Sequence, residues 1–346
     1  MIRTMLVAAA LACAAGMNVK ALAGEGALFD SHDPLALVLE APWRRIMRKR
    51  TDDPAHEGEL RYEGPDASHA LSVDVGLRGH SRLEFCRFPP ISLNFKRKQA
   101  TGTVFDGQNK LKLVTQCASG SRYRDHLRLE YIVYRALNLL TPQSFRVRWV
   151  EIRYIDSEGK RRDKAEPGFF IEDEARMAKR LGLERISAKR LDPRHVDEHY
   201  LGLIALFQFM IGNTDWSIVT GLRGEDCCHN GKLLGSSGVE SDLIVVPYDF
   251  DQAGLIDVDY AIPYEKLGIT DVKQRLYRGF CRTSARLDEI IDQFEAERSA
   301  ILGLLDAVEL SASSKRKAVR YLEGFFDIIG EPEDVERRIE RKCRGT

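Results

Sequence analysis

The chain has 346 residues, of which 44% are hydrophobic and 30% are charged, as in globular proteins that bury a substantial core. Lysine plus arginine and aspartate plus glutamate each number 52, so the net charge is zero and the composition gives no reason to expect nucleic acid or an anionic membrane as a partner. No fixed-period repeat is visible, which argues against solenoids and propellers.

The first 23 residues have the pattern of a signal peptide. Arg3 precedes an apolar, alanine-rich run at residues 5–16, and Ala21 and Ala23 offer the small side chains that signal peptidase recognises. Cleavage before Gly24 would export the protein to the periplasm or the extracellular space. An uncleaved anchor is the alternative, but the run is shorter than the roughly 20 residues that a span needs. We expect the mature chain to be a monomer without a membrane span.

Six cysteines follow this segment, and an even number in an exported chain permits up to three disulfides. They are Cys86, Cys117, Cys227, Cys228, Cys281 and Cys343. Six cysteines allow 15 connectivities. Cys86 and Cys117 flank what look like neighbouring strands, so this pair is the disulfide that we predict.

Residues 24–171 have mainly strand-like patterns. Apolar and polar residues alternate in several short segments, whereas residues 35–50 and 123–140 have helical spacing. The expected strands are 69–76, 91–95, 111–115, 145–155 and 167–172. This part is therefore predicted to be a mostly antiparallel, β-rich lobe with one inserted helix.

Residues 172–346 are predicted to form a mainly helical lobe. The expected helices are 172–181, 193–212, 272–277, 286–305, 314–326 and 333–341. Two short apolar pieces, at residues 233–234 and 243–247, interrupt this pattern and should form a small β-pair. Together the two parts give a two-lobe α+β plan.

Two polar motifs follow apolar elements in the second part. Residues 212–217 (GNTDWS) come directly after an apolar helix, residues 247–251 (PYDFD) end a short apolar strand, and His229-Asn230 lies between them in the chain. Carboxylate and amide oxygens there suit Mg²⁺, which takes few protein carboxylates together with substrate phosphates. The candidate metal ligands are Asn230, Asp249 and Asp251. Asp215 could accept the proton of an attacking hydroxyl. Taken singly, each aspartate is better explained as a helix cap or a solvated turn; the combination favours one site.

Lys112 and Glu130 form a second candidate pair. Lys112 lies on an expected strand and faces opposite to Leu111 and Leu113, while Glu130 lies among apolar residues of the following helix. A lysine on a strand that pairs with a glutamate on a packed helix would position phosphates. For either residue alone, an exposed surface position is the commoner case.

Residues 76–82 (GLRGHSR) form a glycine-containing turn after a strand. Gly76, Arg78 and Gly79 could bring backbone N–H groups and a guanidinium close to a phosphate, although a plain hairpin is the simpler interpretation. The order of the parts favours a site. Glycine turn, Lys, Glu, Asp, Asn and Asp follow one another as they do in protein-kinase-like folds.

These segments together resemble the secreted bacterial relatives of the spore-coat CotH kinase family, among the atypical kinases that include HipA-type toxins. The resembling segments are RGHSR (78–82), CRFPPISLNF (86–95), FDGQNKLKLVTQC (105–117), LEYIVYRALNLL (129–140), GFFIED (168–173), IGNTDWS (211–217), HN (229–230) and PYDFDQAG (247–254). They cover most of residues 70–283. The resemblance implies a bilobal kinase-like fold, with an antiparallel β N-lobe, a mainly helical C-lobe, and ATP and Mg²⁺ between them.

The resemblance also implies roles for individual residues. Lys112 would hold the α- and β-phosphates, Glu130 would orient it, and Asp215 would be the catalytic aspartate. The adenine would face a hinge made of Phe170, Ile171 and Glu172. The metal would be held by Asn230 and Asp249, with Asp251 as a second metal ligand. The chain departs from the usual pattern: Asn230 lies beyond an insertion, and the metal motif reads Asp-Phe-Asp, so either aspartate could be the primary ligand.

The sequence therefore predicts an exported, Mg²⁺-dependent ATP phosphotransferase that acts on a protein or another envelope component. Transfer of AMP in place of phosphate stays open. Two other classes are a catalytically inactive kinase-like binding module, since ATP is scarce in a periplasm, and a metal-dependent hydrolase that uses the aspartates. A hydrolase would tolerate loss of Lys112, whereas a phosphotransferase would not.

Overall fold

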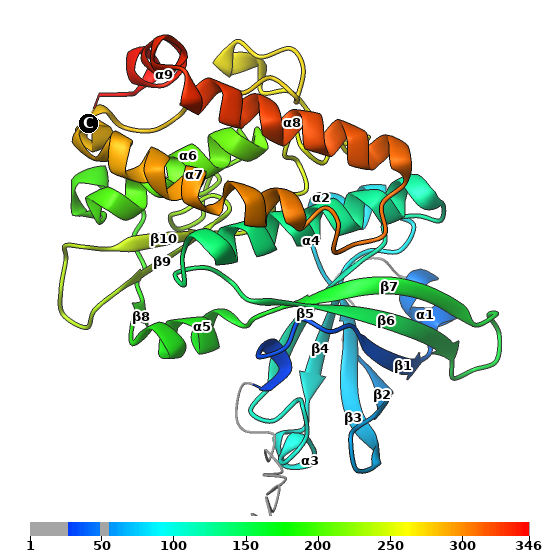
Figure 1. The fold of residues 1–346 in the computed structure, drawn as a ribbon. Helices are drawn as coiled ribbons and strands as arrows, with labels where there is room; N and C mark the ends of the chain where they lie inside the picture. The colour runs from blue at the N-terminus through cyan, green and yellow to red at the C-terminus, as the bar shows by residue number, and fades with distance from the viewer. Residues whose placement is uncertain (1–26, 49–54, 346) are drawn as a thin grey trace, which may run out of the picture.

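The computed structural model describes residues 27–48 and 55–345; the predicted signal peptide, residues 1–23, lies outside the described residues. Figure 1 shows a strand-rich part at the bottom and a group of helices at the top. The long helix α4 (Ser121–Leu140) runs between them.

Seven strands close into a barrel in the order β1-β2-β3-β4-β5-β7-β6. Their bounds are β1 (Leu35–Ala41), β2 (His56–Glu63), β3 (Ser68–Leu77), β4 (Ile91–Phe95), β5 (Lys110–Thr115), β6 (Val147–Asp156) and β7 (Lys164–Ile171). All neighbours pair antiparallel except β1 and β6, which run parallel. On β5, Leu111 and Leu113 point into the barrel core, and Lys112 between them faces the other way, as predicted.

The expectation of a bilobal kinase-like fold is wrong, because the strands form a closed mixed barrel accompanied by a second small sheet and helices. Residues 35–50, expected to be helical, begin with β1 and only then form the short helix α1 (Trp43–Arg48). β2 is not among the strands expected from the sequence. The apolar residues Ala36 and Val38 hide the alternation of β1, and its parallel pairing with β6 over its whole length closes the barrel. A local periodicity contains no information on that long-range pairing.

After Ile171 the chain is mainly helical, as predicted. The helices are α5 (Glu174–Leu181), α6 (Glu198–Ile211), α7 (Leu287–Gly303), α8 (Ala312–Gly330) and α9 (Pro332–Arg338); the short α2 (Ser81–Phe85) and α3 (Arg97–Ala100) belong to the barrel part. Residues 272–277, expected to be a helix, are irregular. None of the helices described is long and apolar enough to cross a membrane.

The predicted β-pair in the helical part is confirmed. β9 (Gly231–Gly235) and β10 (Ile244–Pro247) pair antiparallel, and β8 (Glu184–Arg185) extends them to a three-stranded sheet. The register places Gly231 opposite Pro247, so the start of β9 and the end of β10 lie at the same edge. The polar residues next to these two positions are thereby brought together.

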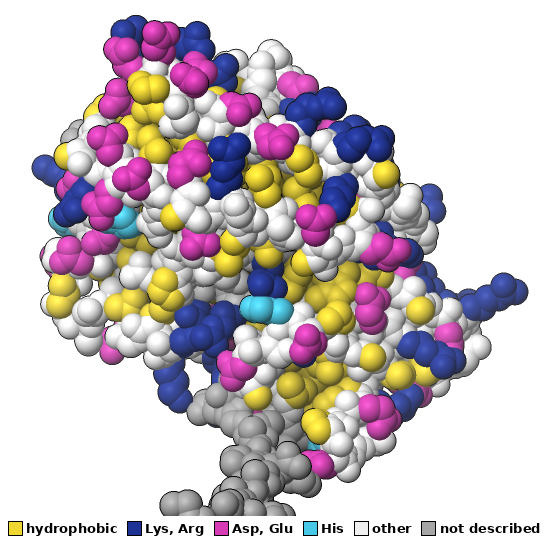
Figure 2. Space-filling model, viewed as in Figure 1, with side chains coloured by type: hydrophobic (Ala, Val, Ile, Leu, Met, Phe, Trp, Pro, Cys, Tyr) yellow, Lys and Arg dark blue, Asp and Glu magenta, His cyan; other side chains and the backbone are white. Residues whose placement is uncertain are grey.

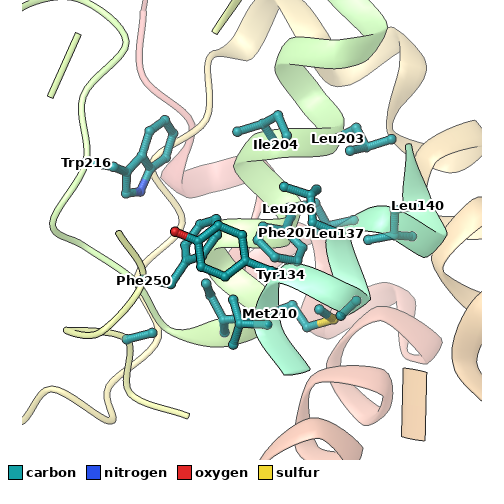
Figure 3. Packing of buried hydrophobic residues seen from close by; sticks show 14 of the residues in the cluster. Tyr134, Leu137, Leu140, Leu203, Ile204, Leu206, Phe207, Met210, Trp216 and Phe250 are labelled. Atoms are coloured by element: carbon teal, nitrogen blue, oxygen red, sulfur yellow. The ribbon is translucent and has the colours of Figure 1, made fainter. Parts of the chain in front are cut away.

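Two apolar cores hold the molecule together. One fills the barrel, and the other joins α4, α6, α7, α8 and the small sheet. Figure 3 shows the second core where α4 meets α6. The ring of Tyr134 on α4 meets Phe250 edge-on at 4.8 Å between centroids, and Phe250 in turn packs on Phe207 of α6 at 5.7 Å. Phe250 thus anchors the loop after β10 in the core by its apolar side chain.

Three cysteine pairs are joined as disulfides. Cys86 pairs with Cys117, as predicted from the flanking strands, and the other pairs are Cys227–Cys228 and Cys281–Cys343. The last pair ties the segment before α7 to the end of the chain across a sequence separation of 62. Closing so long a loop restricts the unfolded chain considerably.

We predict that the double variant Cys281→Ser, Cys343→Ser lowers the free energy of unfolding by about 4 kcal/mol, because the unfolded chain regains the conformational freedom of that loop. Equilibrium denaturation in urea measures it. Cys86→Ser, Cys117→Ser, which opens a loop with a separation of 31, should cost slightly less. Two results together would show that these disulfides do not form. Both variants would have the stability of the wild type, and reduction of the wild-type protein would not increase its number of free thiols.

Candidate functional site

A cavity of about 350 Å³ lies where the barrel meets the loops of the helical part. Its walls come from the turn after β3, from β5 and from the loops that follow α6 and flank the β9–β10 hairpin. Eight residues singled out from the sequence line it: Arg78, Gly79, Lys112, Ile171, Asp215, Asn230, Asp249 and Asp251. Residues up to 251 − 78 = 173 positions apart in the chain thus converge on one site.

Four other residues singled out from the sequence do not line this cavity. Phe170 is fully buried in the barrel core against Phe105, and Glu172 pairs with Arg180. Gly76 lies within β3, and Glu130 lies behind the cavity wall. Of the three expected adenine-facing residues, therefore, only Ile171 reaches the cavity, because successive residues of β7 point to opposite faces.

The end of α6 places Asp215. The helix ends at Gly212, whose φ of +66° is the left-handed conformation that terminates helices. A Cβ at Gly212 would lie 1.9 Å from the Tyr321 hydroxyl, so glycine is required there. The next turn is fixed by Asn213, whose side-chain oxygen accepts the Asp215 backbone N–H at 2.9 Å. The Trp216 indole donates to the Asn213 carbonyl at 3.1 Å.

The carboxylate of Asp215 is held by three side chains. Its Oδ1 lies 2.7 Å from Nε2 of His229, and its Oδ2 accepts N–H groups from Asn230 at 3.0 Å and Gln252 at 3.2 Å. The bond to Asp215 raises the pKa of His229, because the carboxylate favours the charged imidazolium. Asp215 is therefore fixed in orientation and lines the cavity.

The β9–β10 hairpin brings Asn230 and Asp249 to the same edge. Asn230 precedes β9 and Asp249 follows β10, and the Tyr248 N–H donates to the Asn230 carbonyl at 3.1 Å. Both residues have positive φ, +50° for Asn230 and +61° for Asp249. Asn and Asp tolerate this conformation better than other residues with a Cβ, which explains their presence at these turns.

Arg82 is the centre of a buried ionic cluster. Its guanidinium lies 2.8 Å from Glu130 and 2.9 Å from Asp251, and 3.7 Å from Asp249. The Tyr260 hydroxyl donates to Asp251 at 2.8 Å. Glu130 is thus paired with Arg82 and not with Lys112, which corrects the role expected for it. The helix and strand positions of Glu130 and Lys112 were predicted, but their partners depend on an arginine from a third segment.

The carboxylates of this cluster carry more negative charge than Arg82 offsets. The pKa of Glu130 is raised to about 7, chiefly because burial disfavours the charged form. The carboxylate of Asp249 is half exposed in the cavity, and its partial withdrawal from water and the nearby charge of Asp251 raise its pKa. A further cation at this edge of the cavity would therefore be stabilised by the cluster.

Lys112 and Arg78 supply positive charge to the cavity without a carboxylate partner. Neither forms an ion pair with any carboxylate of the described residues. The Lys112 ammonium instead lies over the ring of Tyr248, 5.2 Å from its centroid. Burial lowers the pKa of Lys112 to about 8, and the charges of Arg78 and Lys232 act in the same direction. Burial also lowers the pKa of Arg78.

Three residues of the site were not predicted from the sequence: Arg82, His229 and Gln252. Arg82 stood in the RGHSR segment and His229 beside Asn230, so both were near a recognised signal, but neither was assigned a role. Gln252 follows Asp251 directly and could have been considered with that motif. Their contacts join different segments of the chain, which spacing does not reveal.

The side chains that line the cavity can be compared with those that bind a nucleotide together with Mg²⁺. Within the described ranges, no group of three or more His, Cys, Asp or Glu side chains is placed to hold a metal ion. Mg²⁺ needs only one or two carboxylates when phosphate oxygens and water complete its shell. Asp249, whose side chain is 52% exposed, and the amide oxygen of Asn230 suit that arrangement. The free cations Lys112 and Arg78 suit phosphates.

A comparison of the sequence with protein-family models found no match, and a comparison with curated proteins found none either. The chemistry of the cavity is therefore the basis on which a function can be proposed.

We predict that the Lys112 amine titrates near pH 8 and that Arg78→Gln raises its pKa, because removing a neighbouring positive charge makes the ammonium less costly. NMR of ¹³C-labelled lysine, with Lys112→Arg to assign the signal, measures both values. Arg97→Gln on α3 is the matched control, because Arg97 is exposed and is not among the charges that shift the pKa of Lys112, and it should leave the titration unchanged. A Lys112 midpoint near 10.5 that does not respond to Arg78→Gln would contradict the burial and proximity of these two cations.

Proposed function

We propose that this chain is an exported, Mg²⁺-dependent phosphotransferase that uses ATP and acts on a hydroxyl group of a protein or another envelope component. One observation carries the proposal: two half-buried cations that form no ion pair, Lys112 and Arg78, share a cavity with the aspartates Asp215, Asp249 and Asp251. A cavity that holds both phosphate-binding cations and acids matches the charge pattern of phosphoryl transfer.

Lys112 and Arg78 would hold the phosphates. Both are partly withdrawn from water, and a charge-assisted hydrogen bond to a phosphate oxygen is stronger there than in bulk water because the local dielectric is lower. Gly79, with φ of +101°, lines the same wall, so backbone can approach closely there. Binding of a polyanion would raise the pKa of Lys112 and keep it charged at neutral pH.

Asp249 and Asn230 would hold the metal ion, and Arg82 would keep Asp251 beside them. Bound ATP would supply the phosphoryl group, and Mg²⁺ would neutralise part of its charge. In this arrangement Arg82 and Glu130 are positioning residues, because they act through the aspartates.

Asp215 would accept the proton from the acceptor hydroxyl. Its carboxylate is held by His229, Asn230 and Gln252, so an acceptor oxygen that enters the cavity meets a base of fixed direction. His229 would stabilise the carboxylate by its hydrogen bond. Three disulfides support the proposed export, since disulfides persist in oxidising compartments.

The first test is thermal unfolding of residues 24–346 with and without Mg·ATP. A ligand that binds only the folded state at a hundredfold excess over Kd stabilises it by about 2.7 kcal/mol. We predict this shift for the wild type and its loss in Lys112→Ala and Asp249→Ala. Lys110→Ala, an exposed lysine on the same strand, is the matched control and should keep the shift.

Two outcomes would count against the proposal. The absence of any shift in a folded wild-type protein would favour a binding module without nucleotide chemistry. A shift that survives in Lys112→Ala would remove the role of that lysine and favour a hydrolase that uses the aspartates alone.

We predict that Asp215→Asn leaves the Mg·ATP shift in place but lowers transfer to an acceptor by about 10²–10⁴-fold, because the general base is lost. The variant should also lower the pKa of His229, which the Asp215 carboxylate raises. Radiolabelled phosphate transfer and histidine NMR measure the two effects. Full transfer activity in Asp215→Asn would exclude this aspartate as the proton acceptor.

A further inference from the structure

A second cavity, of about 400 Å³, lies apart from the first and shares no lining residue with it. Its walls come from α4, from β6 and from the segment between α7 and α8, with His32 and Pro34 from the segment before β1 at its edge. Nothing in the proposed phosphotransfer uses it. Its volume is within the range of small-molecule sites in proteins.

One side of this cavity is apolar. Tyr131 and Ile132 of α4 and Trp149 of β6 are buried and contribute to its lining, and Leu304 and Val308 add half-buried aliphatic groups. The rings of Tyr131 and Trp149 meet edge-on, 5.3 Å between centroids. On the face drawn in Figure 2, a hydrophobic area lies between the helices and the barrel, and a histidine and a Lys or Arg side chain border it.

The guanidinium of Arg135 lies beside the apolar wall, and not all of its N–H groups have hydrogen-bond partners. Its Nε is buried and has no hydrogen-bond partner among the described residues. One terminal N–H donates weakly to the Tyr131 hydroxyl at 3.3 Å, and no carboxylate of the described chain forms an ion pair with the guanidinium. Arginine presents a planar fork of donors that fits a carboxylate, and the terminal nitrogens of Arg135, unlike its buried Nε, are the groups that an anion in the cavity would meet.

The charges around Arg135 favour an anion. The two carboxylates of the cavity are exposed at its edge: Glu309 pairs with Arg128, and Glu151 accepts the Trp149 indole N–H at 2.8 Å. The pKa of His32 is lowered by partial burial and next by the charge of Arg135; Arg148 and Arg146 act in the same direction, and Asp33 opposes them. Arg135 is therefore a cation of this cavity that no carboxylate of the described residues pairs with.

We propose that this cavity binds a small carboxylic acid with an apolar body, its carboxylate on Arg135 and its hydrocarbon against Tyr131, Trp149 and Ile132. The amphipathic shape follows from the cavity itself, which has one unpaired guanidinium and apolar walls. Medium-chain fatty acids and arylalkanoic acids share this chemistry. The proposal does not depend on the function of the first cavity.

The test compares decanoate, 3-phenylpropanoate and the neutral decan-1-ol as probes, with binding followed by calorimetry and tryptophan fluorescence. We expect saturable 1:1 binding of at least one acid, with Arg135→Gln weakening it at least tenfold and Arg135→Lys weakening it less, because lysine keeps the charge but lacks the planar fork. Decanol should bind wild type and Arg135→Gln alike, because it lacks the charge. The preferred acid shows whether the site takes an aliphatic or an aromatic body.

Two further variants locate the ligand. Trp149→Phe should keep binding but remove most of the fluorescence change, since Trp149 lines the cavity. Arg97→Gln, an exposed arginine on α3, is the matched control and should bind like the wild type. Saturable binding of neither acid, equal affinity in a folded Arg135→Gln protein, or a full fluorescence response in Trp149→Phe would overturn the proposal.

Discussion

The ionic cluster around Arg82 joins three distant parts of the chain and sets the shape of the site. Arg82 follows the turn after β3, Glu130 lies on α4, and Asp249 and Asp251 follow β10. Each charge is withdrawn from water to a different degree, and each needs the others as partners. Removal of one member of a buried ion cluster typically costs about 3–5 kcal/mol, because the remaining charges stay buried. The barrel and the helical part are thus held in one arrangement at the cavity.

This cluster also explains why Lys112 remains free. Glu130 is occupied by Arg82, so the lysine on β5 has no carboxylate partner and rests on the Tyr248 ring. A second cation that forms no ion pair, Arg78, lines the same cavity and is half-buried. The cavity therefore holds both unpaired positive charge and a cluster of carboxylates. Such a distribution is unfavourable for the isolated protein, and a ligand that carries both phosphate and metal would compensate it.

Several features of the site could be predicted from the sequence. The alternation on β5 placed Lys112 opposite to Leu111 and Leu113, and the motif after α6 placed Asp215 at a helix end. The short apolar pieces predicted the β9–β10 hairpin, whose edge carries Asn230 and Asp249. The partner of Glu130 could not be predicted, because Arg82 lies 48 residues before it and reaches it only in the folded chain.

The sequence by itself determined the local elements that have a clear period or a clear stop: α4 from its apolar spacing, the end of α6 from Gly212, and the Cys86–Cys117 disulfide from the strands that the two cysteines flank. The tertiary structure decided the rest. The parallel pairing of β1 with β6 converted a predicted helix into a strand and an expected lobe into a closed barrel. The physical reason is the same in each case: hydrogen bonds along a strand edge and ion pairs between buried side chains join residues far apart in the chain, and a local pattern specifies only which face of an element is apolar.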